Sequence, residues 1–397
     1  MRAGRYVQQS RGYRAFIPED LPPKPELHWD AALTKLLSDA DRALGRLDGV
    51  ASILPNPNLF VAMYVKHEAV LSSQIEGTQS TLEDLLEYEA AGRIPQAPGC
   101  DVEEVVNYVA AMNQGLERLS SLPLSLRLLR EIHERLLEGV RGSARSPGEF
   151  RTSQNWIGPA GCTLETAQFV PPPPHEMRQA LDALEKFLHE RDDFPELIHC
   201  GLAHAQFETI HPFLDGNGRV GRLLITLLLC ERQVLQRPLL YLSYYFKAHR
   251  AQYYDRLMAI REDGDWEGWL KFFLRGVFQV SQAATEVSRA IMQLREKDRG
   301  IISSHGATAA NGLKLLDHLF QHPLIQVRDA EKLLECSYAT ANSLVRFFEQ
   351  LNILKEITGQ QRNRIYRYDA YYKLFSQQAL TLPAAAAQAE RPGQLEP

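Results

Sequence analysis

Residues 211–222 read HPFLDGNGRVGR and are followed at once by the apolar run LLITLLL at residues 223–229. The glycines and the asparagine of this stretch allow backbone angles that let main-chain N–H groups point at a bound phosphate. A helix that begins near Asn217 would add its free N–H groups and the positive end of its dipole. The stretch therefore predicts an anion-binding loop that leads into a buried helix.

The charged side chains of this loop indicate the kind of anion. Arg219 and Arg222 are three residues apart, so both guanidinium groups would lie on one face of the helix, toward the same anion. Two such charges suit a polyphosphate. Asp215 would repel that anion unless a cation lay between them, and Mg²⁺ usually binds one carboxylate together with phosphate oxygens. Since His211 is then free to act as a general base, spacing alone indicates a nucleotide-phosphate site with a nearby base.

The whole string resembles the signature of the Fic family, HPFx[D/E]GNGRxxR, at every specified position. The resemblance implies that ATP is a co-substrate and that AMP passes to a Tyr, Thr or Ser hydroxyl of a target protein. In that reaction His211 takes the hydroxyl proton, the oxygen attacks the α-phosphate in line, and pyrophosphate leaves. Asp215 is the expected Mg²⁺ ligand. The expected nucleotide-binding residues of the loop are Gly216, Asn217, Gly218, Arg219, Val220, Gly221 and Arg222.

A second motif lies upstream of this loop. The sequence SSQIEG at residues 72–77 resembles the inhibitory motif of Fic proteins, [S/T]xxxE[G/N], in the class that has an amino-terminal inhibitory helix. The resemblance implies that Glu76 pairs with Arg222 and keeps the γ-phosphate of ATP out of its productive position, with Ser72 and Gly77 as the other defining residues. Without the resemblance, Glu76 could equally be a solvated carboxylate on a helix.

Two further segments supply candidate contacts. Residues 142–177 are rich in turn formers, and two short extended pieces at 154–157 and 167–170 predict a β-hairpin. By resemblance this is the flap beside the active site, which binds the target's main chain as an added strand. Gln168 and Phe169 are its candidate ligand contacts. Tyr253, the first of two adjacent tyrosines, resembles the family position that lines the adenine pocket, and core packing is the alternative.

The expected fold class is mainly α: a Fic helical fold with a β-hairpin flap, plus a small winged-helix (α+β) domain. We expect an amino-terminal arm and helical region with the inhibitory motif over residues 1–110, a catalytic domain over 111–300, a winged helix over 301–378 and a disordered tail over 379–397. The winged helix is predicted from the order helix, helix, turn, helix and hairpin.

A winged helix often places its third helix in the DNA major groove. Residues 312–375 contain nine Lys and Arg against seven Asp and Glu, which is a weak electrostatic footprint for DNA. Arg362, Arg364 and Arg367 on the predicted wing are candidate phosphate contacts, and docking or dimer formation is the alternative role. The net charge of -5 also argues against a protein that coats nucleic acid generally.

Three activities remain as interpretations of the chain. AMP transfer is favoured over protein phosphorylation, because the phosphate-transferring toxin branch of the family carries Lys where this chain has Gly218. Removal of AMP by the same site is an alternative, since a glutamate at the position of Glu76 positions a water in some relatives. A nucleotide-sensing, DNA-binding regulator is the alternative from another class. The resemblance adds self-modification and a homodimer as candidate properties.

Compartment is inferred from what the sequence lacks. The start of the chain has no apolar core of a signal peptide, and the densest apolar run, residues 223–230, is too short to span a bilayer. The five cysteines are scattered without zinc-ligand spacing. We therefore expect a cytoplasmic protein that does not associate with membranes.

Overall fold

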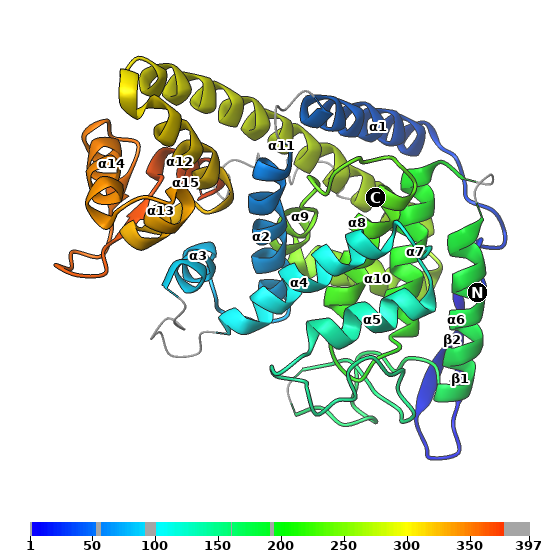
Figure 1. The fold of residues 1–397 in the computed structure, drawn as a ribbon. Helices are drawn as coiled ribbons and strands as arrows, with labels where there is room; N and C mark the ends of the chain where they lie inside the picture. The colour runs from blue at the N-terminus through cyan, green and yellow to red at the C-terminus, as the bar shows by residue number, and fades with distance from the viewer. Residues whose placement is uncertain (1, 53–56, 92–100, 160, 191–193, 377–397) are drawn as a thin grey trace, which may run out of the picture. The chain divides into compact units, whose positions relative to one another are not determined.

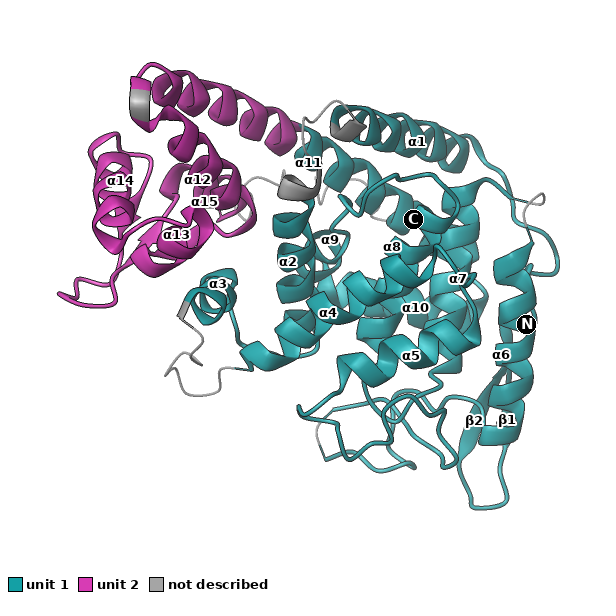
Figure 2. Ribbon diagram, in the orientation of Figure 1, with its two compact units in different colours: residues 1–285 teal, residues 286–397 magenta. Residues whose placement is uncertain are grey.

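The computed structural model describes residues 2–52, 57–91, 101–159, 161–190 and 194–376. It is mainly helical, as predicted, with small antiparallel sheets (Figure 1). The chain divides into two compact units, Met1–Thr285 and Glu286–Pro397 (Figure 2). The tail predicted over 379–397 lies outside the described residues. None of the described helices is both long enough and apolar enough to cross a membrane.

The first unit opens with a hairpin where the sequence suggested an extended arm. Strands β1 (Gly4–Gln8) and β2 (Arg14–Pro18) pair in antiparallel register, with Tyr6 opposite Phe16. Phe16 is fully buried, and its N–H donates to Val170 O at 2.9 Å. The hairpin is therefore fixed to the body of the unit by burial of β2.

Helices form the rest of this unit. They are α1 (Ala31–Ser52), α2 (Pro57–Ile75), α3 (Leu82–Ala91), α4 (Val102–Arg118), α5 (Leu126–Leu136), α6 (Pro174–His189), α7 (Glu196–Ile210), α8 (Asn217–Glu231), α9 (Ser243–Ala248), α10 (Arg250–Asp263) and the first part of α11 (Trp266–Ser303).

The centre of the unit is the pair α7 and α8. Residues 197–210 of α7 are all buried, and α8 is buried along most of its length. Two helices that are buried on nearly all sides form the core of the unit, and the polar side chains that they carry are buried with them. Because α8 packs against α2, α4, α5 and α7, the loop that joins the two central helices is held on several sides (Figure 1).

The segment between α5 and α6 is less regular than predicted. Ile157 and Phe169 exchange two backbone hydrogen bonds, of 2.8 and 3.1 Å, and form a single antiparallel bridge instead of a two-stranded hairpin. Pro159 follows the bridge on one side and prolines 171–174 follow it on the other. Since proline has no N–H to donate, the pairing cannot extend past them.

The second unit contains a small sheet among short helices. Its elements are the rest of α11, a 3₁₀ turn (Gly306–Thr308), α12 (Ala309–Gln321), β3 (Leu324–Gln326), α13 (Val327–Leu334), α14 (Tyr338–Gln350), β4 (Lys355–Glu356), β5 (Ile365–Arg367) and α15 (Asp369–Ser376). The strand order is β3-β5-β4, with both pairings antiparallel. The sequence did not predict β3 or α15. Strand β3 has only three residues, so it shows no alternation of apolar and polar side chains.

Candidate functional site

The loop between α7 and α8 owes its shape to two left-handed residues and one asparagine. His211 has φ 48° and Gly216 has φ 77°. Asn217 Oδ1 accepts from Phe213 N–H and Asn217 Nδ2 donates to Phe213 O, both at 2.8 Å. Helix α8 begins at Asn217, so the N–H groups of its first turn have no intrahelical acceptor. The side chain of Asn217 closes the loop, and the main-chain N–H groups at the start of α8 are left without intrahelical acceptors.

His133 of α5 supports this loop from outside, and the sequence did not single it out. Gly148 N–H donates to His133 Nδ1 at 2.9 Å, so Nε2 carries the proton and donates to Asp215 O at 3.0 Å. The ring stacks on Phe213 with centroids 3.8 Å apart. Burial lowers the pKa of His133 to about 4, so the imidazole is neutral at neutral pH. A lone histidine on a leucine-rich helix gave no signal of this role.

A cavity of about 560 Å³ opens at the N-terminal end of α8. This volume lies in the range of small-molecule and cofactor sites. The walls are formed by Glu76, Trp156, Ile157, Gly158, Pro159, Gln168, Phe169, Glu208, His211, Gly218, Arg222, Arg250, Tyr253, Tyr254, Leu257, Met258 and Arg261. Segments that are far apart in the sequence therefore meet at one site.

The candidate residues divide into two sets. Those that line the cavity are Glu76, Gln168, Phe169, His211, Gly218, Arg222 and Tyr253. Those that do not are Ser72, Gly77, Asp215, Gly216, Asn217, Arg219, Val220 and Gly221. Of the second set, Ser72 accepts a hydrogen bond from Arg222, and Asn217 closes the loop through Phe213.

His211 lies on the cavity wall in the form that a general base requires. Burial, together with the positive charges of Arg261 and Arg151, lowers its pKa to about 3. The imidazole is therefore neutral at physiological pH, which is the protonation state from which a general base acts, and the same depression of its pKa makes it a weak base in this arrangement. Arg151, which the sequence did not reveal, is almost fully buried and donates to both His211 O and Pro172 O. It thereby ties the segment before α6 to the loop.

Arg222 is held by both ends of the upstream motif. Its Nε donates to Ser72 Oγ at 2.8 Å, and one terminal nitrogen donates to Ser72 O at 3.0 Å and to Glu76 Oε1 at 2.7 Å. Side-chain exposure is 2% for Arg222 and 32% for Glu76. Burial opposes the charge of Arg222, but Glu76 and the neighbouring tyrosines raise its pKa above the ordinary value. The guanidinium is thus charged, and its Nε and one terminal nitrogen are engaged by Ser72 and Glu76.

Two glycines explain how Glu76 reaches this position. Helix α2 ends at Ile75, and Gly77 follows with φ 99°, a conformation that favours glycine at a helix end. Across the site, a Cβ on Gly218 would lie 2.1 Å from Glu76 Oε1. The carboxylate therefore occupies space at the start of α8 that is open only because residue 218 is glycine.

Arg219 does not share the cavity with Arg222, in contrast to the prediction that both face one anion. It is nearly fully buried, donates to Glu104 Oε2 at 3.0 Å and lies 3.9 Å from Asp215 Oδ1. Residues three apart on a helix diverge by about 60°, and each long side chain turns to the carboxylate on its own side. The ion pair with Glu104 of α4 therefore orients the Arg219 side chain away from the cavity.

Asp215 is a lone, partly exposed carboxylate. Its Oδ1 accepts from Gly216 N–H at 2.7 Å, and its side chain is 39% exposed. Among the residues that the structure describes, no group of three or more His, Cys, Asp or Glu side chains could hold a metal. A single carboxylate fits Mg²⁺, which takes most of its ligands from phosphate oxygens and water.

Tyr253 is placed by a buried histidine. His204 Nδ1 lies 2.8 Å from Gly221 O, which only accepts, so Nδ1 carries the proton and Nε2 accepts from the Tyr253 hydroxyl at 2.9 Å. Tyr253 itself is fully buried at the cavity wall. Its neighbour Tyr254 is 38% exposed and lines the same cavity, although the sequence interpretation selected only the first of the pair.

Glu208 is a cavity residue that the sequence interpretation missed. Burial raises its pKa to about 7, against the opposing effect of Arg222. Its Oε1 has no hydrogen-bond partner among the described residues and would lie 2.4 Å from a Cβ on Gly221. Glu208 is the one carboxylate in the stretch 197–210, which is otherwise buried and largely apolar. That contrast was the available signal.

Two curated proteins are similar in sequence to part of this chain. The protein adenylyltransferase Fic of Aedes aegypti is 33% identical over 153 residues, which cover 38% of this chain and 27% of that protein. The protein of the same name from Culex quinquefasciatus is 30% identical over 185 residues, which cover 45% and 33%. The chain thus matches a third or less of the length of these curated relatives.

A Fic family protein from Desulfovibrio desulfuricans, solved by crystallography, has a similar fold. The TM-score is 0.56 at 18% identity, over 87% of this chain and 98% of that one, and this likeness concerns the fold alone. The Fic/DOC family N-terminal region matches residues 34–117, and the Fic/DOC family domain matches residues 123–229. With the intact loop and its helical surroundings, these matches identify residues 34–117 and 123–229 as Fic/DOC family regions.

Proposed function

We propose that this protein is an adenylyltransferase that moves AMP from ATP to a Tyr, Thr or Ser hydroxyl of a target protein. The observation that carries the proposal is a neutral His211 on the wall of the same cavity as Arg222 and the first turn of α8. The two insect relatives support it, because both are named protein adenylyltransferase.

The reaction uses these groups in a fixed order. The target hydroxyl loses its proton to the His211 imidazole while its oxygen forms a bond to the α-phosphorus. The bond between the α-phosphorus and the bridging oxygen breaks, and that oxygen leaves with pyrophosphate. The free N–H groups of α8 and the Arg222 guanidinium stabilise the charge that develops on the phosphate oxygens. Mg²⁺ held by Asp215 would neutralise part of the polyphosphate charge.

Glu76 is the proposed inhibitory residue. As long as its carboxylate holds the Arg222 guanidinium at 2.7 Å, that guanidinium is not available to the γ-phosphate of ATP. The carboxylate also lies over Gly218, at the place where the polyphosphate approaches α8. The nucleotide must therefore displace Glu76 before it reaches a productive position.

The test is transfer of label from α-labelled ATP to protein in the presence of Mg²⁺. It compares wild type, Glu76→Gly and Glu76→Gly/His211→Ala, with Glu117→Gln as a control that removes an exposed carboxylate of α4. We expect labelling to rise in Glu76→Gly, to vanish in the double variant and to stay at the wild-type level in the control. Label that comes from γ-labelled ATP instead, or no label in any folded variant that binds ATP, contradicts the proposal.

AMP removal by the same site is measured in the same system. Labelled product is isolated and mixed with unlabelled wild type or with His211→Ala. Loss of label with wild type but not with His211→Ala shows that the same site removes AMP. Label that is stable with both proteins excludes AMP removal under these conditions.

A further inference from the structure

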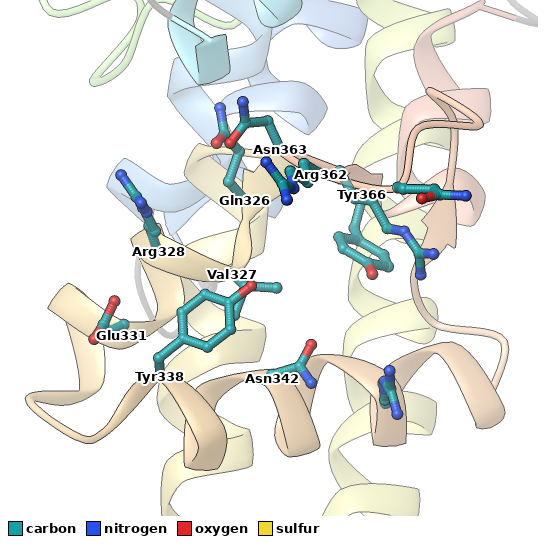
Figure 3. Close-up of a pocket in the computed structure, with 12 residues that line it drawn as sticks. Gln326, Val327, Arg328, Glu331, Tyr338, Asn342, Arg362, Asn363 and Tyr366 are labelled. Atoms are coloured by element: carbon teal, nitrogen blue, oxygen red, sulfur yellow. The ribbon is translucent and has the colours of Figure 1, made fainter.

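A second hollow of about 840 Å³ lies within the carboxy-terminal unit, between α13, α14 and the loop that joins β4 to β5 (Figure 3). Most of the side chains that line it are polar. Four of them are the arginines Arg328, Arg346, Arg362 and Arg364, and one is a carboxylate, Glu331. We call this surface the arginine groove.

Positive charge is concentrated in the arginine groove even though the unit as a whole is nearly balanced. Arg328, Arg346 and Arg362 are exposed and form no ion pair with any residue that the structure describes. Elsewhere in the unit, Arg367 pairs with Asp369 at 2.7 Å and does not line the groove, although the sequence grouped it with the wing arginines. The near-equal totals of the sequence therefore conceal a local excess of unpaired cations.

One stripe of α14 forms the floor of the groove. Tyr338, Asn342 and Arg346 are four residues apart and line the groove together. Figure 3 shows Tyr338 and Asn342 on α14 and Arg328 and Arg362 on the elements across the groove. The opposite side of the helix is buried through Ala341, Leu344, Val345 and Phe348. Packing thus fixes which side chains α14 presents.

We propose that the arginine groove binds double-stranded DNA, with α14 in the major groove. Asn342 and Arg346 are residue types that pair with the edges of adenine and guanine, respectively. Arg328 from α13 and Arg362 and Arg364 from the β4–β5 loop flank the helix and would contact phosphates. An α-helix with 13 residues is about 20 Å long and fits the major groove of B-form DNA.

The shape of the groove favours duplex DNA over other polyanions. The major groove of A-form RNA is too narrow and deep for side chains to reach the base edges, so α14 could not read bases there. An acidic peptide would use the arginines but would leave the amide of Asn342 without a specific partner. This proposal is independent of AMP transfer, because it uses no residue of the first unit.

The first experiment measures affinity and its salt dependence with the full chain. A random-sequence duplex library is selected on the protein, and enriched and scrambled duplexes are compared by fluorescence anisotropy. Arg328→Gln and Arg362→Gln should each reduce the slope of log affinity against log salt by about one. Lys314→Gln and Lys355→Gln, which remove exposed charges outside the groove, should leave the slope unchanged.

The second experiment separates reading of bases from attraction to charge. Arg346→Lys keeps the charge but cannot form the bidentate pair of hydrogen bonds that Arg makes to guanine. Affinity for the enriched duplex should therefore fall roughly 10-fold or more, while affinity for the scrambled duplex stays the same. Asn342→Ala should do likewise. Three results overturn the proposal: no enriched sequence, equal competition by polyglutamate of matched charge, or equal binding of duplex RNA. Lys314→Gln serves as the control and should bind both duplexes as wild type does.

Discussion

Removal of the Glu76 carboxylate should lower the free energy of unfolding of the nucleotide-free protein. It should make ATP binding more favourable by the same amount of free energy. In Glu76→Gln, Arg222 keeps two acceptors on Ser72 and loses its counter-ion. Removing one partner of a buried ion pair costs about 3–5 kcal/mol, and an exposed pair is worth about 0–1 kcal/mol. Because Arg222 is buried and Glu76 is one-third exposed, we expect about 1–2 kcal/mol.

This free energy should appear in two measured quantities, as a lower thermal midpoint and as a higher affinity for ATP. A cost of about 1–2 kcal/mol lowers the thermal midpoint of the nucleotide-free protein by roughly 2–5 °C. In wild type, ATP must first break the pair to reach Arg222, so the same energy appears as roughly 5- to 30-fold tighter ATP binding in the variant. Saturating ATP should therefore raise the midpoint more in Glu76→Gln than in wild type.

Differential scanning fluorimetry and calorimetric titration with ATP and Mg²⁺ give both quantities. Glu117→Gln, an exposed carboxylate change, controls for net charge and should alter neither. In an Arg222→Gln background, Glu76→Gln should change ATP affinity less than it does in wild type, because the ion pair is already absent and only the repulsion between the carboxylate and the polyphosphate is removed. A Glu76→Gln protein that loses stability yet binds ATP as weakly as wild type would refute the reasoning, because Arg222 would then have no part in binding phosphate.

Three further variants test the surroundings of the loop. Burial raises the pKa of Glu208 from its ordinary value of 4.5 to about 7. Between these two values the folded chain keeps a proton that the unfolded chain has released. The contribution of this proton to stability is therefore complete below the lower pKa and is lost as pH rises through the higher one. The thermal midpoint of Glu208→Gln minus that of wild type should therefore be larger at about pH 8 than at about pH 5. An equal difference at both pH values would contradict this expectation. Tyr253→Phe removes the donor to His204 Nε2 and should cost about 1–3 kcal/mol in urea unfolding; an unchanged unfolding midpoint would show that the hydrogen bond is unimportant. His133→Ala frees Asp215 O from its hydrogen bond and should lower AMP transfer in the activated protein by roughly 10- to 100-fold, whereas an unaltered initial rate would mean that the loop holds its shape alone.

The features that the sequence predicted are those with local causes. Asn217 and its glycines predicted the loop and the start of α8, because backbone angles and free N–H groups depend on neighbouring residues. The apolar run after Arg222 predicted a buried helix for the same reason. In the second unit, the predicted order of helix, turn and helix corresponds to α13 and α14, whereas β3 was missed because three residues carry no periodicity.

The sequence by itself determined a mainly helical protein with a glycine-rich loop before a buried helix, and its resemblance to the Fic family predicted the pairing of Glu76 with Arg222. Only the tertiary structure decided where long side chains point. Arg219 turns to Glu104, more than a hundred residues earlier, and Glu208 is buried beneath Gly221. The arginine groove likewise exists because packing brings α13, α14 and the β4–β5 loop together. Such placements depend on which distant element lies alongside, and no local pattern of residues specifies that neighbour.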